Sequence, residues 1–141
     1  HDIGYHISHA EHHQHSYYII SNADLLGFTY EEIEIIANVA RYHRKSHPKL
    51  KHDGFLRLQT DEHRETVRKL ASILRLAESF DRGNTGIVRS VETKVGKKAV
   101  EFLLKPLRGA HRDLGLEIWG AERKKMLFQE VYAREVSFRE V

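Results

Sequence analysis

The chain has 141 residues, which is enough for one domain or for one domain with a small addition. It is 40% hydrophobic and 30% charged, which indicates a folded core rather than disorder, and its lack of cysteine excludes disulfides and thiolate metal ligands. The formal net charge is +3, and there is neither a signal-peptide pattern nor an apolar run of about 20 residues, so we expect a cytoplasmic protein without a membrane partner.

The first half of the sequence predicts helices. One is expected over residues 11–22, and another follows Thr29, whose partner three residues on is Glu32, the pattern of a capping box. Residues 43–59 carry Pro48 and Gly54 and predict a loop rather than a long helix. Thr60 is expected to cap a further helix that reaches residue 83.

The second half changes to a period of two. Residues 87–95 and 99–104 predict strands joined by a turn at residues 96–98, and a helix from Leu114 to about Tyr132, capped by Asp113, precedes a strand over residues 135–139. We therefore predict a mainly α bundle over residues 1–83 and a small α+β subdomain of order β-β-α-β over residues 84–141.

A basic segment follows the second predicted helix. It holds Arg41, Arg44, Lys45, Lys49 and Lys51. Such a segment favours an anionic partner, namely phosphate, polyphosphate, a nucleotide or nucleic acid, although a solvated surface loop would look the same. Few aromatic residues alternate with these charges, so we do not expect nucleic acid to be the partner.

The sequence also offers ligands for a divalent metal ion. His1 and Asp2 are adjacent, and an imidazole beside a carboxylate suits hard or borderline cations. Glu78 and Asp81 continue an apolar helical stripe, so at least one of them is expected to face the interior and to need a partner there. That partner is either a metal ion, with His15 and His43 as further ligands, or simply Arg75 or Arg82. The other early histidines, His6, His9, His12 and His13, are interpreted as ordinary core or surface residues.

Four segments resemble, in order and spacing, the HD-like domain and tail of the exopolyphosphatase/guanosine-pentaphosphate phosphohydrolase family. They are His1-Asp2, His15-Ser16, Arg41-Tyr42-His43-Arg44-Lys45, and residues 74–82. The resemblance implies an HD-type histidine–aspartate bundle that belongs to a longer protein. In that family, cleavage uses magnesium in N-terminal actin-like domains, which are absent from these residues.

The resemblance implies an accessory role for this chain: binding polyphosphate or guanosine pentaphosphate, with Arg41, Arg44 and Lys45 on the anion, and supporting a homodimer. The catalytic residues are unknown. The alternative is a metal-dependent HD phosphohydrolase acting on a nucleotide, with Mg²⁺ or Mn²⁺ held by His1, Asp2, His15, His43, Glu78 and Asp81. Two features of the sequence argue against a complete HD metal site. The sequence lacks an upstream histidine, and it has a glutamate, Glu78, where an aspartate is usual.

Overall fold

The computed structural model describes residues 1–107 and 113–141, and these divide into two compact units, His1–Leu74 and Arg75–Val141. The division falls within the helix α4 (Asp61–Ser79), whereas the predicted domain boundary lies in the turn after that helix. Both divisions leave every strand in the second part. No helix in the described part of the chain is long and apolar enough to cross a membrane.

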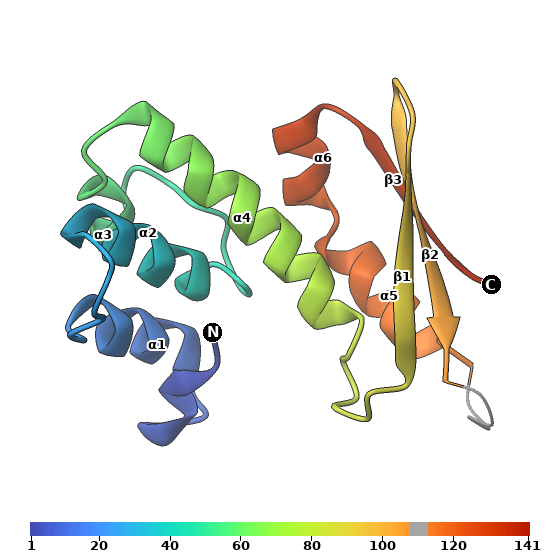
Figure 1. Cartoon of the computed structure of the whole chain (residues 1–141), viewed down its shortest axis with the longest axis horizontal. Helices are drawn as coiled ribbons and strands as arrows, with labels where there is room; N and C mark the ends of the chain where they lie inside the picture. The colour runs from blue at the N-terminus through green and yellow to red at the C-terminus, as the bar shows by residue number, and fades with distance from the viewer. Residues whose placement is uncertain (108–112) are drawn as a thin grey trace. The chain divides into compact units, whose positions relative to one another are not determined.

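The first unit is helical. The 3₁₀ helix η1 (Ile3–His6) packs on α1 (His12–Ser21), and α1 lies beside α2 (Tyr30–Arg41), followed by the short α3 (Asp53–Leu56) and the first part of α4 (Figure 1). The side chains that form its core, all nearly inaccessible to solvent, are Ala37, Ala40, Tyr42, Phe55, Leu58, Val67 and Ala71. The loop predicted over residues 43–59 thus contains one short helix.

The predicted capping box fixes the start of α2. The Thr29 hydroxyl accepts a hydrogen bond from the Glu32 backbone N–H at 3.3 Å, and the Glu32 carboxylate accepts one from the Thr29 N–H at 2.8 Å. Each bond satisfies a backbone donor that the first turn of a helix leaves unpaired. The C-terminal end of α2 at Arg41 leads directly into Tyr42 and His43, both of which are buried.

The second unit packs helices on one side of a small sheet (Figure 1). Its strands are β1 (Val88–Val95), β2 (Ala99–Pro106) and β3 (Glu135–Glu140), in the order β1-β2-β3. β1 and β2 are antiparallel, and β2 and β3 are parallel. The helices are α5 (Gly115–Lys124), α6 (Met126–Tyr132) and the end of α4. The described residues therefore form a mixed α+β fold.

The core of this unit explains the period of two in its strands. Val100, Phe102 and Leu104 of β2 share one face with their partners Val136 and Phe138 of β3. This face packs against Leu76 and Phe128 of the helices and against Phe80 and Leu114, which adjoin α4 and α5. Alternate residues of β2 and β3 thus enter one apolar layer, whereas β1 is exposed from Arg89 to Val95.

The helix predicted from Leu114 to Tyr132 is two helices in the structure. α5 ends at Lys124 and α6 begins at Met126, with Lys125 between them. Asp113 was predicted to be the N-cap, but Leu114 occupies that position, and the Asp113 carboxylate instead accepts a hydrogen bond from the Gly115 N–H at 3.1 Å. No glycine or proline marks the break, so it follows from packing rather than from local propensity.

Candidate functional site

The site forms where η1 contacts α1. A methyl group in place of the Gly4 hydrogen would lie 2.0 Å from the His12 carbonyl oxygen and 2.6 Å from the Ser16 nitrogen, so only glycine permits this approach. The Gly4 N–H donates a buried hydrogen bond to the Ser16 hydroxyl at 2.9 Å. This contact holds His1 and Asp2, which precede η1, beside the first turn of α1.

Two buried imidazoles face each other at this point. His12 at the start of α1 and His43 after α2 have side chains only 1% exposed, and their Nε2 atoms are 3.2 Å apart. The His12 Nδ1 is 3.1 Å from the His9 carbonyl oxygen, and the His43 Nδ1 is 2.6 Å from that of Ala40. A carbonyl oxygen can only accept a hydrogen bond, so both Nδ1 atoms act as donors, and the two Nε2 atoms are left facing each other at hydrogen-bonding distance.

Two lone pairs at this separation repel each other unless a cation lies between them. A backbone carbonyl that fixes the tautomer of an imidazole is also the usual second contact of a metal-binding histidine. A proton could satisfy the pair by converting one ring to an imidazolium, and a metal ion could satisfy it by accepting both lone pairs. The geometry therefore favours a bound cation.

Asp2 completes a triangle of ligand atoms. One of its carboxylate oxygens, Oδ1, lies 3.4 Å from the His12 Nε2 and 3.5 Å from the His43 Nε2. Ligand atoms about 2.1 Å from one tetrahedral metal ion stand about 3.4 Å apart, so the three atoms have the spacing of ligands to a single ion. His1 adds a fourth nitrogen, 3.4 Å from the other Asp2 oxygen. We call His1, Asp2, His12 and His43 the imidazole cluster.

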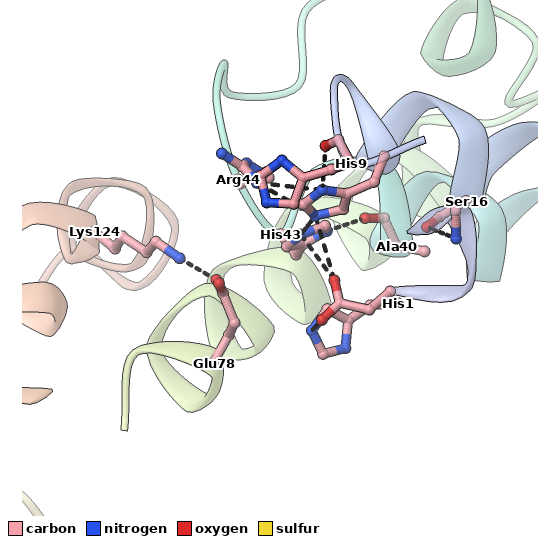
Figure 2. A network of polar contacts seen from close by, with 11 residues as sticks. His1, His9, Ser16, Ala40, His43, Arg44, Glu78 and Lys124 are labelled. Atoms are coloured by element: carbon pink, nitrogen blue, oxygen red, sulfur yellow. Dashed lines mark hydrogen bonds and ion pairs between the residues drawn. The ribbon is translucent and has the colours of Figure 1, made fainter. Parts of the chain in front are cut away.

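The cluster is open to solvent on one side. The His1 and Asp2 side chains are 30% and 47% exposed, whereas those of His12 and His43 are buried. Figure 2 shows His1, His43 and Arg44 gathered at one place, with the contact from His43 to Ala40 dashed. A small anion can therefore reach the cluster from the side that carries His1 and Asp2.

Of the three predicted anion-binding residues, Arg44 borders the cluster. Its Nη1 lies 3.3 Å from the Nδ1 and 3.4 Å from the Nε2 of His12, so the guanidinium lies against the imidazole ring. The Arg41 guanidinium is instead within 5.5 Å of the Tyr17 ring centre and 5.7 Å of that of Tyr42. These cation–π contacts give Arg41 a structural role at the end of α2. Lys45 is exposed on the following turn.

His13, next to His12 in the sequence, is also buried. Its Nε2 is 3.5 Å from a carboxylate oxygen of Glu11, and its Nδ1 has no hydrogen-bond partner among the described residues. Burial lowers the pKa of His13, and the charge of Arg44 lowers it further, while Glu11 acts in the opposite direction. Burial thus favours the neutral form of the His13 imidazole beside the cluster.

One comparison with known proteins identifies the family. The model of Ppx/GppA phosphatase domain III matches residues 1–122, which include all of the imidazole cluster and Arg44. The chain belongs to the Ppx/GppA phosphatase family. This confirms the resemblance seen in the sequence, and it indicates that the chain is part of a protein of this phosphatase family.

The remaining predicted ligands of the Ppx/GppA chain have local surroundings of their own. His15 is half-buried on α1. Glu78 lies in the second unit, where it forms an ion pair with Lys124, and the Asp81 carboxylate accepts hydrogen bonds from the Thr85 and Gly86 N–H groups at 3.0 and 2.9 Å. The participation of His15, Glu78 and Asp81 in a metal site with His1, Asp2 and His43 stays a prediction.

The residue that sequence reasoning missed is His12. It was grouped with His6, His9 and His13 as an ordinary residue, yet it is among the most buried side chains of the chain and contacts both Asp2 and His43. A usable signal was present, because His12 and Ser16 are four residues apart and both lie on the buried side of α1. Polar residues at buried helical positions indicate a polar site.

Proposed function

We propose that this Ppx/GppA domain is an accessory portion of an exopolyphosphatase-type phosphoanhydride hydrolase and that it binds polyphosphate, or the phosphates of guanosine pentaphosphate, beside the imidazole cluster. The observation that carries the proposal is the Arg44 guanidinium, held against the buried ring of His12. It belongs to a basic segment, residues 41–52, that contains no aspartate or glutamate. A phosphate chain offers the many anionic oxygens that such a segment would attract.

Arg44 is suited to phosphate because it is already ordered. A guanidinium can donate to two phosphate oxygens at once, and the contact with His12 restricts its side chain before the anion arrives. Lys45 and the lysines at 49 and 51 add point charges along the same segment. Arg41 contributes its charge while its guanidinium stays over the tyrosine rings.

The test is the binding of long-chain polyphosphate to the chain, measured by calorimetry. We expect Arg44→Gln to weaken binding about threefold to tenfold, because a charge-assisted hydrogen bond to phosphate is lost. Arg57→Gln is the control, since Arg57 is an exposed arginine of the first unit that lies outside the basic segment, whereas Arg44 is half-buried. Rising salt is expected to weaken binding throughout. Equal losses in the two variants would show that Arg44 has no particular role.

A second candidate function is favoured by the paired Nε2 atoms: an HD-type metal-dependent phosphohydrolase acting on a nucleotide. The donor set fits a divalent metal ion. Imidazole nitrogens with one carboxylate suit manganese, iron or zinc, whereas magnesium prefers oxygen ligands throughout. A bound ion would supply Lewis acidity and a water of lowered pKa. His12, His43 and Asp2 would hold the ion, with His1 beside them, and Arg44 would orient the phosphate.

The proposal includes a homodimer, for which the edge strand β1 offers a surface. Among the described residues β1 pairs with β2 alone, and its residues from Arg89 to Val95 are exposed. In an antiparallel pairing of two copies centred on Thr93, Glu92 of one copy would lie opposite Lys94 of the other, and Val91 would lie opposite Val95. Each of these pairs would occur twice, once on each side of the two-fold axis. Opposite charges and apolar side chains in such positions stabilise neighbouring strands, and a two-fold axis repeats each pair.

Reversing one charge of β1 tests this dimer. We expect Lys94→Glu to weaken self-association about tenfold, because it places a carboxylate opposite Glu92 of the second copy on both sides of the axis. Lys97→Glu makes the same change of charge in the turn after β1 and serves as the control. Sedimentation equilibrium measures the association constant. A wild-type chain that stays monomeric, or equal effects of the two variants, would exclude this surface.

A further inference from the structure

The single tryptophan of the chain lies within cation–π distance of two arginines. Trp119 is on α5 and is 48% exposed. The Arg82 guanidinium carbon is 5.1 Å from its ring centre, and that of Arg123 is 4.8 Å away. Arg123 lies one helical turn after Trp119, whereas Arg82 comes from the turn after α4. We call these three residues the Trp119 clamp.

The chain makes room for Arg82 to reach α5. Gly120 is buried, and a methyl group there would lie 2.9 Å from the Cδ of Arg82. The arginine stem therefore crosses α5 at the residue that has no side chain, which directs its guanidinium to the neighbouring Trp119. Both guanidiniums are thus ordered by contact with one indole ring, and a ligand would lose less side-chain entropy on binding them than on binding mobile arginines.

The region of the clamp has an excess of positive charge. Lys124 follows Arg123 and is ion-paired with Glu78. Burial lowers the pKa of Lys124, and the charges of Arg75 and Arg82 lower it further, while Glu78 acts in the opposite direction. In the described part of the chain, neither Arg82 nor Arg123 has an ion pair with a carboxylate. The ion pair of Glu78 with Lys124 therefore leaves the positive charges of Arg82 and Arg123 without a carboxylate partner among the described residues.

The other carboxylates of α5 do not supply the missing charge. Glu122 forms an ion pair with Lys125. Glu117 is buried, with only 3% of its surface exposed, so its side chain is not part of the exposed surface of the helix. An anion from solution can therefore approach two ordered guanidiniums without competing with a carboxylate already bound to them.

We infer that the Trp119 clamp is a binding site for a phosphoanhydride chain, and specifically for inorganic polyphosphate. The inference deepens the proposed function by adding a second contact on the same class of ligand. Phosphate oxygens suit guanidinium groups, and successive phosphates can engage Arg82 and Arg123 in turn. A nucleotide shares this chemistry, but its base would have to stack on an indole ring that already contacts two guanidiniums. This favours the inorganic chain.

The emission of Trp119 tests the inference directly, because no other tryptophan contributes to it. Tripolyphosphate is expected to change this emission at saturable concentrations, whereas sulfate at equal ionic strength is not. Arg82→Gln and Arg123→Gln should each raise the midpoint about threefold to tenfold, and Arg123→Lys should raise it less. Arg89→Gln, a change at an exposed arginine of β1 in the same unit, should leave the midpoint unchanged.

Three results would overturn the inference: an emission that does not respond, a midpoint unchanged in both glutamine variants, or an equal response to sulfate. Guanosine triphosphate is expected to bind no more tightly than tripolyphosphate, and much tighter binding would reassign the clamp to a nucleotide. The proposed function is tested separately. If Arg44→Gln does not weaken polyphosphate binding while Trp119 still responds, the site at Arg44 is excluded and the clamp is retained. The reverse pattern excludes the clamp alone.

Discussion

Replacing His43 with alanine is expected to weaken the binding of Mn²⁺ at least about 100-fold. Loss of an outer contact to a metal-binding histidine already reduces affinity about 10- to 100-fold, and this substitution removes a ligand itself. The reason is the geometry of the cluster, in which the His43 Nε2 faces the His12 Nε2 at 3.2 Å and an Asp2 oxygen at 3.5 Å. Calorimetric titration of Mn²⁺ into the untagged chain measures the effect.

Two further variants keep this test independent of folding. His43 is fully buried, so its loss could also disturb the first unit. Asp2→Asn removes the carboxylate charge at a side chain that is 47% exposed and has nearly the same shape, so it should reduce Mn²⁺ affinity without unfolding the chain. His63→Ala, at a half-buried histidine near the start of α4, should leave the affinity unchanged. Retention of full affinity in Asp2→Asn would contradict the assignment.

Replacing Gly4 with alanine should destabilise the fold and the cluster together. The added methyl group would meet backbone atoms of His12 and Ser16 at 2.0 and 2.6 Å, and backbone in a helix cannot rotate away as a flexible side chain can. Inserting a group into a packed site costs about 1–3 kcal/mol. We expect the free energy of unfolding in urea to fall by about 2 kcal/mol and Mn²⁺ affinity to fall although no ligand is changed.

Gly83→Ala is the matched control for this variant. Its methyl group would lie 3.4 Å or more from its neighbours, which is an ordinary contact, so we expect a change in the free energy of unfolding of less than about 0.5 kcal/mol. A Gly4→Ala chain with unchanged stability and unchanged Mn²⁺ affinity would show that η1 does not depend on close contact with α1.

Local signals in the sequence located most helices and strands. Thr29 and Glu32 formed the predicted capping box because its two bonds join groups three residues apart. The strands β2 and β3 were found because one of their faces enters an apolar core and imposes a period of two. The break at Lys125 had no such signal, because no glycine or proline stands between α5 and α6.

The candidate site was predicted only in part. The sequence alone does not show which of several neighbouring histidines is buried, because that depends on the residue at which the helix starts. In the structure α1 starts at His12, directly after Glu11, whose backbone is in the left-handed conformation. Glu78 was expected to meet a metal ion, Arg75 or Arg82, whereas the ion pair that it forms in the second unit is with Lys124, 46 residues further along the chain. No local pattern specifies a contact of that separation.

A crystal grown with Mn²⁺ and tripolyphosphate tests the central claim most directly. We expect an anomalous peak from Mn²⁺ between the Nε2 atoms of His12 and His43 and the Asp2 carboxylate. We also expect phosphate density in contact with the Arg44 guanidinium. Manganese bound only elsewhere, or a phosphate chain that leaves Arg44 untouched while the imidazole pair stays 3.2 Å apart with nothing between, would contradict it.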